Sequence, residues 1–162
     1  MTLPVQRGAS IATASALGAI GAVHVAWGFG SSFPFGDRAT LADTVVGNDV
    51  VPGRRASLAV AGLLAIAAGL VADVLPVPRS LRRIGVVGVG AVLATRAAFG
   101  FAGATARLVP GSDSSKFVAT DRRVFAPLCA ALAAGAVVSA TRLSGPRRSA
   151  SSAGSRRARR PG

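Results

Sequence analysis

Apolar and charged residues are segregated along this chain into long alternating blocks. Asp, Glu, Lys and Arg are absent from residues 8–36, 56–72, 84–95 and 124–141. A charged side chain at the centre of a bilayer costs about 2.5–3.5 kcal/mol even on insertion-based scales, so a lipid-exposed chain keeps such blocks free of charge. Strands of a membrane β-barrel would be half as long and would alternate in polarity, and these blocks do not.

The four blocks predict four transmembrane helices, because a helix needs about 20 mainly apolar residues to cross the hydrocarbon core. We place them at residues 9–29, 56–75, 84–104 and 124–142. A signal peptide is the alternative for the first span, but the segment before it carries only Arg7 and the apolar run continues past any cleavage site. The expected fold class is therefore all-α: a polytopic membrane protein in which residues 1–142 form a four-helix transmembrane bundle.

The distribution of Lys and Arg predicts that both termini lie in the cytoplasm. With the N-terminus inside, the inner segments hold eleven Lys and Arg residues and the outer loops hold seven. The side richer in these residues is the cytoplasmic one. The connection between the second and third spans is short, so these two spans should be antiparallel neighbours.

Two local patterns add detail to the bundle. Residues 37–47 of the first outer loop predict a short helix at the membrane surface, with Asp37 as its N-cap and Gly47 as its stop. Small residues also recur every four positions in the first two spans, which predicts close packing over them, although an Ala- and Gly-rich chain can produce such stripes by chance. The stripes are Ala14, Gly18, Ala22 and Ala26, and Ser57, Ala61, Ala65 and Gly69.

The net charge of +13 comes from eighteen Arg and one Lys against six Asp and no Glu. Residues 143–162 are rich in Ser, Gly and Arg and lack an apolar period, which predicts a disordered basic cytoplasmic tail. Each Arg beside an anionic leaflet gains about 1 kcal/mol, so we expect the tail to contact anionic lipid headgroups. The arginines concerned are Arg147, Arg148, Arg156, Arg157, Arg159 and Arg160. No nucleic acid is expected as a partner, because no aromatic residue is interleaved with them and a bilayer span lies directly upstream.

Arg96 is the most unusual polar residue, because it lies inside the third span, about 18 Å from its inner boundary at 1.5 Å per residue. Its guanidinium has to extend to the interface, pair with a carboxylate or bind carbonyl groups. Two interpretations follow. Arg96 ties helices together, or it contacts an anion or another ligand in an outward-facing pocket.

His24, Trp27 and Asp121 are expected at the same outer face as Arg96. Trp27 follows His24 by one turn, at a depth where Trp commonly anchors to headgroups. Asp121 precedes the fourth span, where it could pair with Arg96 or His24, or act as a solvated loop residue or helix N-cap. These four residues form the candidate cluster, either as a structural lock or as a ligand site.

The sequence contains no standard catalytic pattern: there is no Gly-x-Ser-x-Gly, no His-Glu-x-x-His and no phosphate-binding Gly-rich loop. There is no second His and no Cys–His spacing that suits zinc, so no metal and no cofactor is expected. We therefore expect a protein that is not an enzyme.

Two motifs resemble a bacterial integral-membrane family, the domain of unknown function 3995. His24-Val-Ala-Trp27-Gly-Phe-Gly-Ser-Ser-Phe33-Pro34 is similar to its His-x-x-Trp-x-x-Gly-x-x-Trp-Pro pattern. Asp121-Arg-Arg-Val-Phe125-Ala-Pro127-Leu-Cys129 is similar to its Asp-x-x-x-Tyr-x-Pro-Leu-Cys pattern, and here Phe33 replaces Trp and Phe125 replaces Tyr. The resemblance covers roughly residues 10–142. It implies a four-helix bacterial membrane protein and no activity, since the family has none assigned.

Two functions are therefore expected from different classes. The first is a non-enzymatic structural or accessory component of the bacterial cytoplasmic membrane. The second is binding or transport of a small ligand or anion through an outer pocket lined by His24, Trp27, Arg96 and Asp121. The direction of Arg96 separates them. An Arg96 that faces the interior, near Asp121 and beside a cavity, favours the pocket, whereas one that extends alone through lipid does not.

Overall fold

The computed structural model describes residues 3–144, and within that range every regular element is helical. The four long helices are α1 (Leu3–Gly28), α3 (Arg54–Ala72), α4 (Arg79–Ala102) and α6 (Ala126–Ser144). Short helical segments occupy the connections: α2 (Arg38–Leu41), the π-helical η1 (Ala42–Val46), the 3-10 helix η2 (Thr105–Arg107), α5 (Ser115–Thr120) and the π-helical η3 (Asp121–Phe125). The predicted basic tail lies almost wholly outside the described residues.

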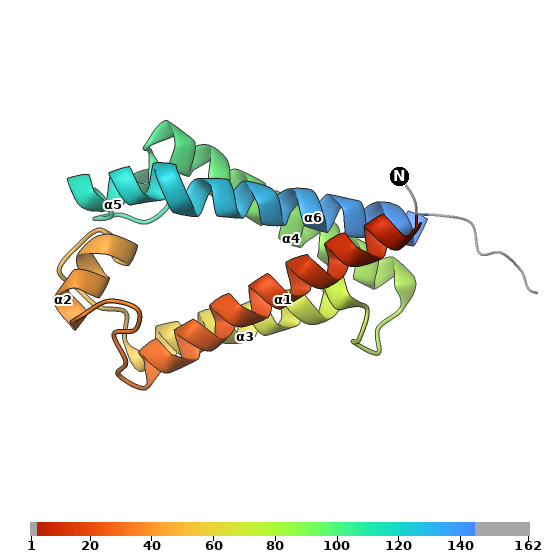
Figure 1. Ribbon diagram of the computed structural model, residues 1–162, viewed down its shortest axis with the longest axis horizontal. Helices are drawn as coiled ribbons and strands as arrows, with labels where there is room; N and C mark the ends of the chain where they lie inside the picture. Colours follow the sequence, from red (N-terminus) through yellow and green to blue (C-terminus); the bar gives the residue numbers. More distant parts are fainter. Residues whose placement is uncertain (1–2, 145–162) are drawn as a thin grey trace, which may run out of the picture.

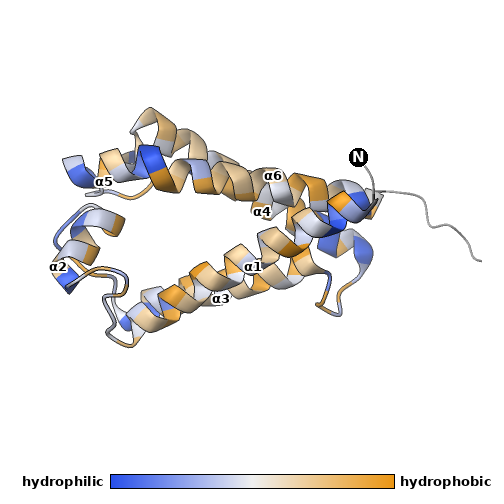
Figure 2. Ribbon diagram, in the orientation of Figure 1, coloured by the Kyte–Doolittle hydropathy of each residue, from blue (hydrophilic) through white to orange (hydrophobic). Residues whose placement is uncertain are grey.

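The prediction of an all-α fold with four membrane-spanning helices is confirmed. Four helical stretches are long and apolar enough to cross a membrane: Pro4–Gly28, Arg54–Ala72, Arg79–Ala102 and Ser115–Leu143. The last of these is longer than the predicted span, because α5, η3 and α6 follow one another without a break. Figure 2 shows hydrophobic residues along the long helices and hydrophilic residues gathered toward their ends.

Three helix boundaries differ from the prediction by three residues or more. α1 begins at Leu3 rather than residue 9, so the helix includes Arg7. α4 begins at Arg79 rather than residue 84. The prediction used the first residue of the charge-free block, whereas the helix itself begins where its backbone hydrogen bonds begin, five residues earlier. α3 ends at Ala72 rather than residue 75. Asp73 follows it in the left-handed conformation (φ 66°), and the Val74 N–H then bonds the Gly69 carbonyl at 3.1 Å.

The long helices form two pairs rather than one evenly packed bundle. α1 packs mainly on α3, and α4 packs mainly on α6. Figure 1 shows the pairs converging where the chain begins and diverging toward α2 and α5. We call the end where the pairs converge the terminal end; it also carries the α3–α4 turn and the end of α6. We call the other end, which carries α2, η1, η2 and α5, the loop end. α3 and α4 are joined by a short turn as predicted, but each has its main partner elsewhere.

The two pairs are joined near the terminal end by small and hydroxyl-bearing residues. The Ser10 and Ser139 hydroxyls lie 2.8 Å apart. A Cβ added at Gly135 of α6 would lie 1.9 Å from the Thr13 hydroxyl oxygen, so this crossing requires glycine. Leu17 and Val86 are fully buried beside it. This is the close packing over small residues that stabilises helix association in lipid.

The predicted stripe on the first span is only partly the face that packs, since Ala14 and Ala26 are half-buried and Ala14 packs against the core. Gly18 and Ala22 are exposed, whereas Ser10, Thr13, Leu17 and Gly21 are buried. On α3 the prediction is closer, since Ser57, Ala61 and Gly69 are buried and Ala65 is exposed. A helix made largely of Ala and Gly has small residues on several faces, so their spacing alone selects none of them.

The predicted loop helix over residues 37–47 is confirmed, with one change. Asp37 Oδ1 accepts from the Thr40 backbone N–H at 2.8 Å, and Gly47 stops the helix with φ 84°. Its second half, η1, is π-helical rather than α-helical. Its predicted place at the membrane surface stays a prediction.

The loop helix is joined to the second large loop across the loop end. The Gly47 carbonyl accepts from the Ser114 N–H at 3.2 Å, and the Ser114 hydroxyl donates to the Asp43 carbonyl at 3.1 Å. The buried Phe117 ring lies against Gly47, where an added Cβ would come within 2.8 Å of it. These contacts hold the two loops together over the diverging helix pairs.

Candidate functional site

Arg96 and Asp121 form a two-pronged ion pair between α4 and η3. Arg96 Nη2 donates to Asp121 Oδ1 at 2.8 Å, and Nη1 donates to Oδ2 at 3.1 Å. The Thr105 hydroxyl donates to the same Oδ2 at 2.5 Å. The Asp121 side chain is 1% exposed and that of Arg96 is 27% exposed. Because a buried carboxylate is costly unless its lone pairs are satisfied, these three donors explain how Asp121 can lie in the core.

The local backbone creates the space for this pair. A Cβ at position 100 would lie 2.7 Å from the Ala126 Cβ and 3.0 Å from Arg96 Nη1, so Gly100 lets α4 and α6 approach beside it. Gly103 then ends α4 in the left-handed conformation (φ 65°), and the chain turns into η2, which carries Thr105. Asp121 is the first residue of the π-helical turn, an element that often marks functional sites.

His24 and Trp27 lie together near the end of α1. Their rings are 4.8 Å apart between centroids and are tilted by 54°. His24 Nδ1 lies 2.9 Å from the Ile20 carbonyl oxygen, a contact that requires the proton on Nδ1. The neutral imidazole is then left with Nε2 as an acceptor. Trp27 Nε1 donates to the Phe33 carbonyl at 2.7 Å, so Phe33 contributes through its backbone and its exposed ring is not involved.

A cavity of about 450 Å³ lies at the loop end and brings most of the candidate cluster together. His24, Trp27 and Arg96 line it, while Asp121 is outside the lining and holds Arg96 in place. Its walls are otherwise mainly apolar, with a few hydroxyl groups. The remaining lining residues are Leu41, Val45, Val46, Val51, Pro52, Ala56, Ser57, Val60, Thr105, Val109, Ser112 and Phe117.

Sequence reasoning missed Thr105 and the contribution of the loops. Thr105 both donates to Asp121 and lines the cavity, yet nothing in its surroundings distinguishes it from other loop residues. Val45, Val109 and Phe117 become walls of the cavity because the two loops join over the diverging helices. A clue existed only for Val45, which lies on the predicted loop helix.

The charges at the cavity nearly cancel, because the Arg96 guanidinium is matched by the Asp121 carboxylate. The hydrogen bonds to Asp121 and Thr105 involve Nη1 and Nη2. The Arg96 Nε–H and the second N–H of Nη2 have no hydrogen-bond partner among residues 3–144 in the structure. The site can therefore offer donors from Arg96 and an acceptor from His24 to one molecule. Within residues 3–144, no three His, Cys, Asp or Glu side chains gather closely enough to hold a metal ion.

Comparison with known proteins gives one match. The model of a family described as protein of unknown function, DUF3995, matches residues 17–136, a range that includes all four candidate residues. No curated protein and no solved structure matches the chain.

Proposed function

The chain belongs to the DUF3995 family, a premise that supplies no activity, and from the site itself we propose that its loop-end cavity binds a small amphiphilic molecule. The observation that carries this proposal is the position of Arg96. Its guanidinium lies at the cavity and is held there by the buried Asp121, instead of extending alone through lipid. The sequence identified this arrangement as the one that favours a pocket.

The size and lining of the cavity support binding of a small molecule. Ligand pockets usually measure about 300–1,000 Å³ and combine mainly apolar walls with a few convergent polar groups. The loop-end cavity has about 450 Å³, with Val, Leu and Phe side chains around Arg96, His24 and the Ser57 hydroxyl. Trp27 adds a large aromatic surface at one side.

The charge balance indicates the chemical class of the ligand. Asp121 already neutralises Arg96, so an anion would have to compete with a buried carboxylate that accepts three hydrogen bonds. A neutral hydroxyl or carbonyl group can instead accept from the remaining Arg96 N–H groups, and a hydroxyl can also donate to His24 Nε2. The ligand that fits is mainly apolar and carries one neutral hydrogen-bonding group.

The second candidate function is that of a non-enzymatic structural or accessory component. It is favoured by the same ion pair, because Arg96 and Asp121 join α4 to the start of the fourth span whether or not the cavity is filled. The two functions predict different effects of substitutions in the cavity walls. A structural lock needs Arg96 and Asp121 but does not depend on other lining residues, such as Ala56 of α3.

We place the protein in the bacterial cytoplasmic membrane with the terminal end and both termini in the cytoplasm. The excess of eleven Lys and Arg over seven supports this orientation. The cavity would then open near the outer face. The tail arginines, from Arg147 to Arg160, lie outside the described residues, and their contact with anionic headgroups stays a prediction.

The experiment compares two Phe substitutions on α3. Ala56→Phe places a ring in the cavity, whereas Ala59→Phe adds the same ring one turn away at an exposed position that does not line it. The full-length proteins are purified from membranes in mild detergent, and co-purified small molecules are extracted and measured by mass spectrometry. We expect one species with the wild type and Ala59→Phe that is absent from Ala56→Phe. Equal small-molecule content in all three proteins would contradict the binding function and leave the structural one.

A further inference from the structure

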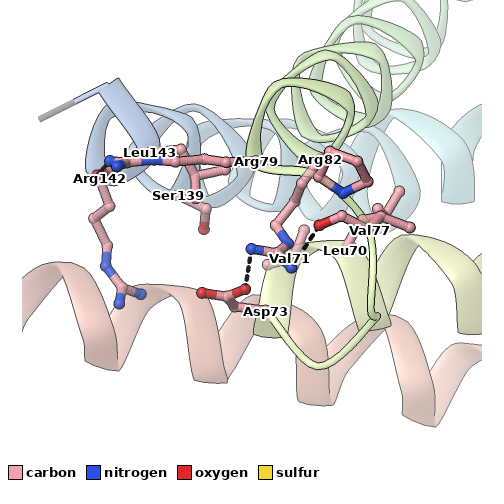
Figure 3. Close-up of a pocket in the computed structure, with 10 residues that line it drawn as sticks. Leu70, Val71, Asp73, Val77, Arg79, Arg82, Ser139, Arg142 and Leu143 are labelled. Atoms are coloured by element: carbon pink, nitrogen blue, oxygen red, sulfur yellow. Dashed lines mark hydrogen bonds and ion pairs between the residues drawn. The ribbon is translucent and has the colours of Figure 1, made fainter. Parts of the chain in front are cut away.

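A second cavity, of about 580 Å³, lies at the terminal end between α3, α4 and α6. Figure 3 shows it with its side chains: Arg79 and Arg82 come from α4, Arg142 from α6, and Asp73 from the end of α3. Of the ten residues that line it, three are arginines and one, Asp73, is acidic. The lining therefore carries more positive than negative charge, in contrast to the loop-end cavity.

Two of the three arginines donate hydrogen bonds to neutral groups, and Arg79 makes a further interaction as well. Arg79 Nη2 donates to the Arg142 carbonyl at 3.4 Å, and Arg142 Nη1 donates to the Ser10 hydroxyl at 3.0 Å. Carbonyls and hydroxyls fix the direction of a guanidinium without neutralising its charge. A set of fixed cationic donors suits an anion, because the binding site needs little reorganisation when the anion arrives.

Arg82 is held by a carboxylate and two backbone carbonyls. Nη1 pairs with Asp73, and Nη2 donates to the Leu75 carbonyl at 2.8 Å and the Val77 carbonyl at 3.3 Å. Its side chain is 13% exposed, and its buried Nε has no hydrogen-bond partner in the structure. Because Nε is shielded from solvent, Arg82 contributes to the cavity through the charge that it shares with Asp73 and not through a free N–H.

The N-terminus of α4 adds to the positive potential of this cavity. Pro78 is its N-cap, supplies no side-chain hydrogen bond, and lines the cavity with Arg79. The first backbone N–H groups of a helix and its macrodipole both favour anions. Apolar residues stand beside these groups, among them Leu70, Val77 and Leu143.

We propose that the terminal-end cavity binds the phosphate group of an anionic phospholipid. The three arginines and the start of α4 supply the anion-binding groups. The apolar neighbours and the position at the ends of membrane-length helices favour a lipid over free phosphate. This proposal does not depend on ligand binding at the loop end, because the two cavities share no lining residue.

The test measures binding of short-chain phosphatidylglycerol to the full-length protein in detergent, with short-chain phosphatidylcholine as the reference lipid. The double variant Arg79→Gln/Arg142→Gln keeps hydrogen-bonding amides and removes two charges from the lining. The matched control is Arg83→Gln/Arg55→Gln, two exposed arginines outside the cavity, so that total charge is equal. We expect the cavity variant to lose about tenfold or more in affinity for phosphatidylglycerol and the control to lose less than about threefold, since screened surface charges contribute little.

A further variant blocks the cavity with every arginine in place. Val77→Trp adds bulk to its lining from the α3–α4 turn, and we expect it also to lose binding of phosphatidylglycerol. Thermal unfolding of each variant establishes that it is folded before binding is compared. Equal losses in cavity and control variants, full binding by Val77→Trp, or equal affinity for the two lipids would each overturn the proposal. Displacement of the lipid by inorganic phosphate at equal concentration would also overturn it, in favour of a free-phosphate site.

Discussion

The molecule holds an Arg–Asp pair at each of its ends, and the two pairs differ mainly in the burial of the carboxylate. At the loop end, Asp121 is 1% exposed and accepts from Arg96 and Thr105. At the terminal end, Asp73 is 51% exposed and pairs with Arg82. The residue types are the same, but one carboxylate is shielded by protein and the other remains at the surface.

This difference contributes to the different chemistry of the two cavities, one of which lies beside each pair. The buried Asp121 must be paired at all times, so it cancels the charge of Arg96 and leaves a nearly neutral, apolar cavity. The exposed Asp73 is one acid beside three arginines, so its cavity stays basic. The arginines are cations at both ends, but at the loop end one buried carboxylate matches the charge of Arg96, whereas at the terminal end three arginines face one carboxylate.

The largest effect is expected from breaking the buried pair on one side. Arg96→Met leaves Asp121 buried without its main partner, which should destabilise the protein by about 3–5 kcal/mol. The double variant Arg96→Met/Asp121→Leu removes both charges and should recover most of that loss. Thermal unfolding in mild detergent measures both. A double variant as unstable as Arg96→Met would show that the pair itself, and not the uncompensated carboxylate, carries the stability.

The next effect concerns the space beside the same pair. Gly100→Ala places a methyl group 2.7 Å from the Ala126 Cβ and 3.1 Å from Asp121 Oδ1, so α4 and α6 must move apart, at a cost of about 1–3 kcal/mol. Gly88→Ala in the same helix meets no atom within 4 Å and is the matched control. It should be neutral or slightly stabilising, because Ala favours helix over Gly by up to about 1 kcal/mol. Equal unfolding temperatures for the two variants would refute the close approach at Gly100.

A smaller effect is expected from the exposed pair. Asp73→Asn removes the charge opposite Arg82 and keeps a residue type that tolerates the left-handed conformation at this position. The carboxylate is half-exposed and screened by water, so the expected loss is below about 1 kcal/mol. Thermal unfolding of Asp73→Asn and Asp121→Asn tests the comparison directly, since the substitution at the buried position should lose several times more stability. Similar losses at the two positions would mean that carboxylate burial does not separate the pairs.

The smallest effect lies at the cap of the loop helix. The hydrogen bond from the Thr40 backbone N–H lowers the pKa of Asp37 below its ordinary value of 3.8. Because the folded pKa is the lower one, the stability from this cap is complete above the unfolded pKa and is lost as pH falls below about 3.8 through the folded value. Asp37→Asn keeps the cap without titrating, so it should remove that part of the acid dependence. Identical acid-unfolding curves for the two proteins would exclude a role for Asp37.

The sequence was sufficient to predict the four long helices, because they depend on where charge is tolerated. A bilayer excludes charge over about 20 residues, which is why four spans could be identified. Arg96 stood out for the same reason. The expected topology placed Asp121 on the same face but left open whether it pairs with Arg96, pairs with His24 or caps a helix, and the structure pairs it with Arg96. The N-cap Asp37 and the stop at Gly47 could be predicted because each rests on local hydrogen bonding.

The packing face of α1 and the shape of the cavity could not be predicted. Gly18 and Gly21 are equivalent in composition, yet only Gly21 packs against α3, where Ala61 lies. Which face of α1 packs against α3 depends on the whole surface of both helices. Thr105 and Phe117 enter the site through loops whose course is set by contacts distant in sequence, such as that between Ser114 and Gly47. The π-helical turn that begins at Asp121 also left no pattern in the sequence.

The central claim, that the loop-end cavity binds a small amphiphile, can be tested with the single tryptophan of the chain, because Trp27 lines that cavity. A terminally brominated decanol serves as probe, since bromine quenches tryptophan fluorescence on contact. We predict saturable quenching in the wild type and in Ala59→Phe, and weak, non-saturating quenching in Ala56→Phe. Brominated decane, which lacks the hydroxyl for Arg96 and His24, should bind more weakly. Non-saturating quenching of equal strength in all three proteins would contradict the claim.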